Sequence, residues 1–155
     1  MDEKKPNPAK TYLRRYKALV LRRQSLLREI DRLRESLTGT TVQLKQDVVT
    51  GGGVSDRMGA TVAKIVDAEE ALRPALADIA QQISGIMEAI DSVPDEMQKT
   101  VLTLRYINGL DWITIADRIG YEERQTFVIH GRALIEVNRW LEKSAGKCSF
   151  KNAIM

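Results

Sequence analysis

Two long runs of apolar residues, spaced alternately three and four apart, constrain what this chain of 155 residues can fold into. In the first run a single charged residue, Arg23, interrupts the pattern. Its members are Tyr12, Tyr16, Leu19, Leu26, Ile30, Leu33 and Leu37. Such spacing over more than three heptads is typical of a helix that packs along a coiled-coil seam. We therefore expect a helix that starts after Pro8 and ends at Gly39.

The second run keeps one heptad frame, with Glu69 as its only charged interruption. Its members are Met58, Val62, Ile65, Leu72, Leu76, Ile79, Ile83, Ile86, Ile90 and Val93. Pro74 lacks the N–H that would bond to the carbonyl of Glu70, so it should kink or restart this helix.

The segment between the two runs, 39–55, contains the glycine run 51–53 and is expected to be a loop. No Gly-Lys-Ser/Thr follows these glycines and no strand precedes them, so a flexible connection fits better than a phosphate-binding loop. We expect residues 1–93 to form an antiparallel coiled-coil hairpin that mediates oligomerisation. Exchange of the helices between chains stays open because the loop is long.

The two charged interruptions predict a specific contact. In an antiparallel pair the numbers of facing residues have a nearly constant sum; Leu37 opposite Met58 gives 95, other seam pairs give 92 or 95, and Arg23 and Glu69 give 92, so the two would face each other. An unpaired charge in an aliphatic seam is costly, whereas a pair would fix the register while adding little net stability. We therefore predict that Arg23 and Glu69 form a register pair, within one chain or between chains. The alternative is that both side chains leave the seam.

Charge is distributed unevenly along the chain. Residues 1–38 carry 11 Lys and Arg against 5 Asp and Glu, a net charge of +6, whereas 39–93 carry 4 against 8, a net charge of −4. The basic first third can contact a polyanion or pair with the acidic middle third of the same chain.

Composition narrows the chemistry further. One cysteine and one histidine allow neither an intramolecular disulfide nor a cysteine-based or histidine-rich metal site, and we expect no cofactor and no metal. The N-terminus shows no apolar leader segment, and no apolar run reaches the length of a membrane span, so we expect a cytoplasmic protein without a membrane partner.

After Pro94 the heptad frame stops and short apolar clusters follow, separated by Asn108-Gly109 and Gly120. This pattern predicts helices at about 95–107, 111–119 and 122–143, followed by a weakly ordered tail, 144–155. The whole chain is therefore predicted to be all-α.

The last two of these helices fit the requirements of a helix-turn-helix. Ala116 is small enough for a close helix crossing, and Gly120 tolerates the positive φ that the turn needs. The apolar residues that would hold the second helix down are Ile115, Ile119, Tyr121 and Ile129.

Residues on both sides make this stretch resemble region 4 of the sigma-70 family, the helix-turn-helix that reads the promoter −35 element. The flanking segments are Val93-Pro94-Asp95, Val101-Leu102-Thr103-Leu104-Arg105-Tyr106, Gly109-Leu110 and Arg132-Ala133-Leu134. The whole chain also resembles small phage-type regulators, in which a basic coiled-coil helix, a loop ending like Ser55-Asp56-Arg57 and an acidic helix precede the sigma-like module. ArpU- and RinA-type activators are relatives in role. The resemblance implies a DNA-binding transcriptional regulator encoded by a phage or prophage.

The same resemblance implies which residues would face DNA. The base-reading positions are Glu123, Arg124, Gln125, Phe127 and Val128. Arg124 suits guanine, Gln125 suits adenine, and the two apolar residues suit thymine methyl groups. The residues implied to contact DNA phosphates are Lys99, Arg118 and Arg132.

The sequence departs from the family pattern at three positions. Thr126 replaces a buried Val or Ile, Val128 replaces a polar or basic reader, and Glu122 replaces a Ser or Thr cap. The first departure is expected to weaken the clamp between the two helices.

Two other classes of function are alternatives to DNA reading. Phe127 and Val128 favour an interaction module that binds RNA polymerase or another regulator without reading DNA, as a degenerate sigma region 4 would. An enzyme is disfavoured because the sequence offers no metal cluster, no nucleophile with a base and no phosphate-binding loop.

Overall fold

The computed structural model describes residues 5–46 and 54–152, with side chains described for 5–39 and 58–146. The regular secondary structure of these residues is helical and contains no strand, which confirms the all-α prediction. The elements are α1 (Pro8–Gln46), α2 (Val54–Asp91), α3 (Glu96–Leu102), the π-helical turn η1 (Thr103–Ile107), α4 (Trp112–Ile119) and α5 (Glu123–Asn152).

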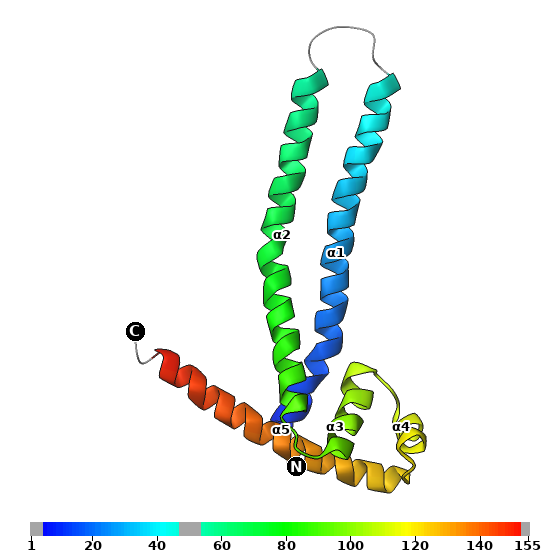
Figure 1. Ribbon diagram of the computed structural model, residues 1–155, viewed down its shortest axis with the longest axis vertical. Coiled ribbons are helices and arrows are strands. Elements are labelled where there is room, and N and C mark those ends of the chain that lie inside the picture. The colour runs from blue at the N-terminus through cyan, green and yellow to red at the C-terminus, as the bar shows by residue number, and fades with distance from the viewer. Residues whose placement is uncertain (1–4, 47–53, 153–155) are drawn as a thin grey trace. The chain divides into compact units, whose positions relative to one another are not determined.

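Contacts divide the chain into two compact units. One comprises 20–81 and holds long parts of α1 and α2, which run antiparallel and side by side (Figure 1). The other joins the chain up to Leu19 with the chain from Gln82 onward. This division differs from the expected boundary at residue 93, because the first turns of α1 and the last turns of α2 share a core with the later helices.

Several helices are longer than predicted. α1 continues through Gly39 to Gln46, so the expected loop at 39–55 is helical at both ends, and the glycine run 51–53 lies outside the described residues. A single helical glycine costs only about 1 kcal/mol, and Leu44 continues the heptad frame seven residues after Leu37. α2 passes through Pro74 without ending.

At the other end of the chain, α5 reaches Asn152, so most of the predicted tail is helix.

The structure pairs Glu69 with Arg34 rather than with Arg23. The Arg34 Nε lies 2.7 Å from the Glu69 Oε1, and this bond, followed by the charge of Glu69, raises the pKa of Arg34. Arg23 is exposed and forms no ion pair with any described residue. Arg34 lies three turns further along α1, about 16 Å at the helical rise.

The physical reason for the difference is the place of the connection. We predicted a loop centred on residue 47, whereas the segment between α1 and α2 is 47–53, centred on residue 50. A connection centred on a later residue changes the register of α2 against α1. Every facing pair therefore differs from the predicted one, and Glu69 does not face Arg23.

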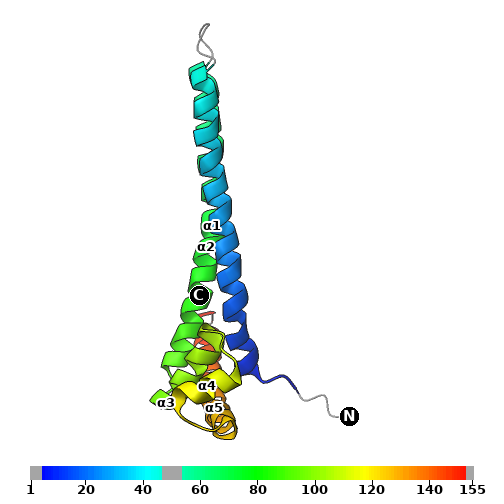
Figure 2. The same ribbon diagram turned by 90° about the vertical axis from the view of Figure 1, so that its right-hand side faces the viewer.

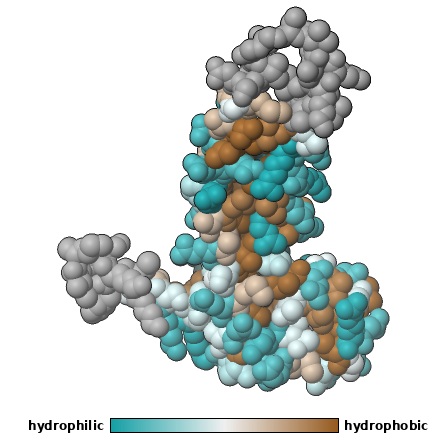
Figure 3. Space-filling view, turned by 45° about the horizontal axis from the view of Figure 1, so that its top comes forward, coloured by the Kyte–Doolittle hydropathy of each residue, from teal (hydrophilic) through white to brown (hydrophobic). Residues whose placement is uncertain are grey.

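The seam of the 20–81 unit is only partly buried. Ile65 and Ile79 are buried, but the α1 residues Leu26, Ile30, Leu33 and Leu37 are half-buried. Apolar residues outside the seam, including Leu21 and Val66, are about half exposed, at 56% and 47%. Figure 3 shows brown, apolar surface running between teal side chains along this helix pair.

In the other unit, α3, α4 and the first half of α5 lie close together in both views (Figure 2). All five α-helices contribute to its core, whose largest fully buried side chains are Leu13, Ile86, Val93, Val101, Leu102, Ile115, Thr126 and Val137.

A polar contact ties the start of α1 to α5. Asn7 precedes Pro8, a residue that suits the first helical position, and its side-chain oxygen accepts from Lys10 N at 3.3 Å. The Asn138 Oδ1 accepts from Ala9 N at 2.9 Å, and its Nδ2 donates to the Asn7 Oδ1 at 3.3 Å. Asn138 thus satisfies a backbone N–H that the helix itself leaves unpaired.

Gly120 ends α4 in the left-handed conformation, with φ 71° and ψ 30°, and its N–H donates to the carbonyl of Ala116. A side chain there would be strained whatever the space around it. Gly131, inside α5, has helical geometry and open space where a Cβ would stand.

We predict opposite effects on stability at these two glycines. Gly120→Ala should lower the free energy of unfolding by about 1–2 kcal/mol, because it forces an L-residue into the left-handed region. Gly131→Ala should raise it by about 0.5–1 kcal/mol, because alanine restricts the unfolded chain and favours helix. Urea unfolding of both variants measures this, and a loss at Gly131 equal to that at Gly120 would contradict the turn geometry.

Candidate nucleic-acid interface

The first two turns of α5 carry the five predicted base-reading residues, and all five are exposed. At 100° per residue, Arg124, Val128 and Gly131 fall on one outward stripe. Glu123 and Gln125 lie on opposite flanks of that stripe. The helix can therefore present Arg124 and Val128 centrally to a partner, with the other candidates at the edges.

Phe127 is partly occupied by a contact inside the protein. Its ring lies 4.7 Å from the ring of Trp112 at the start of α4, at an interplanar angle of 45°. The side chain keeps 46% of its surface exposed. One face of Phe127 thus packs on α4, and the rest is free to touch a ligand.

The other neighbour of Trp112 on α5 is His130, which is 7% exposed. Its ring stands edge-on to Trp112 at 4.7 Å and stacks with Tyr106 at 5.8 Å. The Tyr106 hydroxyl and the His130 Nε2 share a hydrogen bond of 2.9 Å. Burial, together with the positive charges of Lys10, Arg105 and Arg14, lowers the pKa of His130 from 6.5 to about 4.

The π-helical turn η1 places two residues of this site. Its wider turn is closed by Asn108 N, which donates to the Thr103 carbonyl at 3.0 Å. Tyr106 points into the core, and Arg105 stands over the Trp112 ring at 4.7 Å. The Arg105 Nη1 also donates to the Leu110 carbonyl at 2.7 Å. A guanidinium so held is oriented before any ligand arrives.

Thr126, which departs from the sigma pattern, is fully buried. Its hydroxyl donates to the Glu122 carbonyl one turn earlier at 3.1 Å. The polar atom is therefore satisfied within α5, and the methyl group remains available for the core. This geometry removes the cost that a buried unpaired hydroxyl would have at this position.

The remaining predicted positions differ in their surroundings. Of the helix-turn-helix core, Ile115 and Ala116 are buried, and Ile119 and Ile129 are half-buried. Among the phosphate candidates, Arg118 and Arg132 are exposed.

The third phosphate candidate, Lys99, is less free. Its Nζ lies 3.1 Å from the Glu96 Oε1. This pairing makes it the weakest phosphate candidate of the three.

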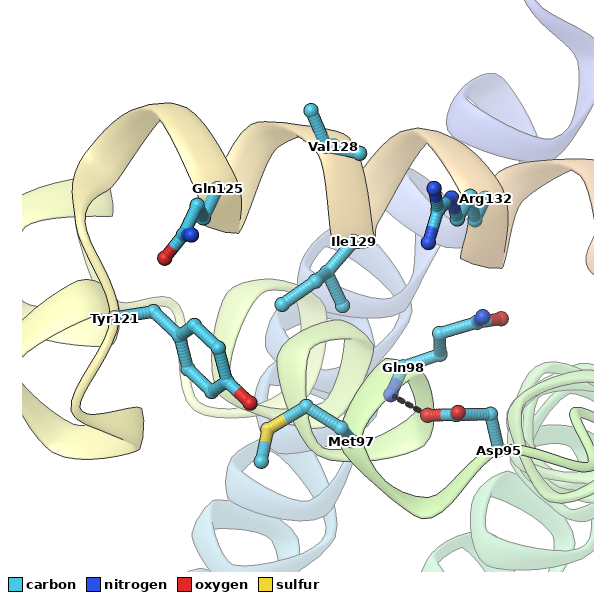
Figure 4. Close-up of a pocket in the computed structure, with 8 residues that line it drawn as sticks. All are labelled: Asp95, Met97, Gln98, Tyr121, Gln125, Val128, Ile129 and Arg132. Carbon is cyan, nitrogen blue, oxygen red and sulfur yellow. Dashed lines mark hydrogen bonds between the residues drawn. The ribbon is translucent and has the colours of Figure 1, made fainter.

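A pocket of about 380 Å³ lies between α3 and α5 (Figure 4). It is lined by Asp95, Met97, Gln98, Tyr121, Gln125, Val128, Ile129 and Arg132. Met97 and Ile129 form its apolar centre, with polar groups toward its ends. The Gln98 Oε1 is buried and has no hydrogen-bond partner among the described residues.

Sequence reasoning missed the cluster of Arg105, Tyr106, Trp112 and His130. Arg105 and Tyr106 belong to a flanking segment of the motif, and the sequence marks His130 only as the single histidine of the chain. The bond between Tyr106 and His130 joins residues 24 apart across the fold. No spacing rule could have found it.

In the part of the chain that is described, no three or more His, Cys, Asp or Glu side chains gather into a group that could hold a metal ion. None of the described helices combines the length and apolar character that crossing a membrane requires.

We predict that His130 makes stability depend on pH. The folded state keeps this histidine neutral, while the unfolded chain protonates it near pH 6.5. The stabilisation is full above that pH and is lost as pH falls from 6.5 toward 4, with a slope of at most about 1.4 kcal/mol per pH unit. Because His130 is the only histidine, it is the side chain expected to dominate the change in stability between pH 7 and 5.5.

His130→Gln is the matched variant, because glutamine also offers Tyr106 a polar partner. Its free energy of unfolding should stay nearly level over the same range. An equal decline in the variant and the parent protein would show that another group is responsible.

The comparisons with known proteins leave the site to be interpreted from its geometry. No protein-family model matches the chain, and neither a curated protein nor a solved structure matches it.

Proposed function

We propose that the chain is a DNA-binding transcriptional regulator of a phage or prophage, acting in the cytoplasm, whose α4, turn and α5 form a sigma region 4-like helix-turn-helix. The observation that carries this proposal is the turn at Gly120. The left-handed cap and the buried Ala116 set α5 across α4 and leave the first two turns of α5 open to a ligand. That is the part of a recognition helix that enters the major groove of double-stranded DNA.

The exposed side chains supply a reading chemistry. Arg124, on the outward stripe, has the fork that recognises guanine O6 and N7, and Gln125 on its flank suits adenine. Phe127 and Val128 suit thymine methyl groups, with Trp112 holding the Phe127 ring in place. Arg118 and Arg132 supply phosphate contacts, which add affinity without sequence preference.

The proposed arrangement is a coiled-coil helix pair, 20–81, joined to a compact unit that contains the DNA-binding module, 94–143. The half-buried seam of 20–81 supports self-association, because helices gain most of their stability by burying an apolar face. A second copy would cover Leu21, Leu27, Val62 and Val66, all more than 40% exposed. A dimer would also offset the weak binding of one helix-turn-helix.

A second candidate function is a protein-interaction module that binds bacterial RNA polymerase or another regulator. The outward face of α5 favours it, since Val128 and Ile135 are 49% and 53% exposed on nearly the same stripe. An apolar face of this kind suits a partner protein better than a phosphate backbone.

The test of DNA reading is selection of a preferred duplex from a mixed-sequence library, followed by binding of variants. Arg124→Ala should cost about 1–3 kcal/mol on the preferred duplex and far less on random DNA. Arg139→Ala is the matched control, because it removes the same charge from a later turn of α5, where the guanidinium pairs with Glu136 at 2.6 Å. It should leave the preference unchanged.

Equal losses on preferred and random DNA would remove Arg124 as a reader. The interaction module requires a different result, in which the purified protein ignores DNA at physiological salt and binds purified RNA polymerase. A salt-sensitive DNA complex formed without polymerase would argue against that module in its pure form.

A further inference from the structure

A basic surface that does not belong to α5 lies on the same compact unit. It is made by Lys5, Lys10, Arg14 and Lys17, from the start of the chain, and by Arg105 of η1. We call these five residues the basic face. Lys10, Arg14 and Lys17 are spaced four and three apart and therefore share one side of α1.

Two hollows show that the basic face is continuous. Arg14, Lys17 and Arg105 line one, together with Tyr106 and Gly109. Lys5, Lys10 and Arg14 line the next, so Arg14 joins the two. The positive charges of Lys10, Arg14 and Arg105 all act on the buried His130, which places the three around one point.

The protein itself leaves this charge largely uncompensated. None of the five residues forms an ion pair with a described residue. Asp111 is an acid that interacts with the charge of Arg105. Hydrogen bonds from the backbone N–H and the side chain of Thr114, followed by the charge of Arg105, lower the pKa of Asp111. In the acidic middle of the chain, Glu69 pairs with Arg34 and not with a residue of the basic face.

The distance from the basic face to the proposed reading helix α5 is comparable to the width of the DNA major groove. Arg105 stands 4.7 Å from the Trp112 ring, and that ring stands 4.7 Å from Phe127, so Arg105 lies within about 10 Å of Phe127. The major groove is about 12 Å wide, so phosphates flank the base edges at a comparable distance.

We infer that the basic face binds the phosphate backbone of double-stranded DNA beside the groove that α5 enters. This inference rests on the proposed function and extends it. Arg105 contacts the phosphates nearest the groove edge, and Lys10, Arg14 and Lys17 of α1 follow the backbone outward. The first helix of the chain thereby becomes part of the DNA-binding surface.

The test compares two triple variants that remove the same charge from the same helix. K10Q/R14Q/K17Q neutralises the three residues of the basic face that lie on α1, and R22Q/R28Q/R32Q neutralises three exposed arginines of α1 in the 20–81 unit. The probe is a labelled duplex of mixed sequence, and the readout is the slope of log Kd against log salt. Thermal unfolding by circular dichroism verifies that both variants keep the fold.

K10Q/R14Q/K17Q should flatten the slope of log Kd against log salt by about 2 to 3, since each lost phosphate contact contributes about 0.9. The control should keep the parent slope. Equal flattening in both variants would reduce the effect to net charge and overturn the inference, as would an unchanged slope in K10Q/R14Q/K17Q. If the parent protein shows no salt-dependent DNA binding, the proposed function fails, and the inference fails with it.

Discussion

The contact of His130 with Tyr106 and Trp112 is the interaction on which the candidate site depends. It joins η1, α4 and α5 through one neutral, buried imidazole. Trp112, which packs edge-on against His130, also contacts Phe127 and has the Arg105 guanidinium over its ring. The same three side chains therefore support the angle between α4 and α5, the placement of the proposed reading helix and the edge of the basic face. A charged imidazole would be both desolvated and repelled by Lys10, Arg14 and Arg105, which explains why the histidine stays neutral.

Local patterns predicted the helices well, because heptad spacing, Ala116 and Gly120 act over a few residues. They failed where the outcome depends on distant parts. Gly39 predicts a helix end, but α1 continues past it to Gln46, and Glu69 pairs with Arg34 instead of Arg23. The π-helical turn and the Tyr106–His130 bond are set by tertiary packing and leave no spacing signal. Thr126 was recognised as unusual, but only the structure shows the bond that satisfies its hydroxyl.

The bond from Ala9 to Asn138 joins the two ends of the chain into one unit. A boundary drawn where the heptad frame stops, at residue 93, would have left the basic start of α1 with the helix pair. In the fold, that segment shares a core with α5, so charge that looked like one half of an internal balance becomes available to a partner. The proposed reading helix and the basic face thus belong to one compact unit.

Amide chemical-shift mapping tests the central claim most directly. The ¹⁵N-labelled full chain is titrated with a duplex of mixed sequence, and the shifted amides are assigned. The account predicts that the largest changes fall at 123–132 of α5 and at 10–17 of α1, with little change at 58–79 of α2. Changes confined to the 20–81 unit, or an α5 that stays silent while DNA binds, would contradict it.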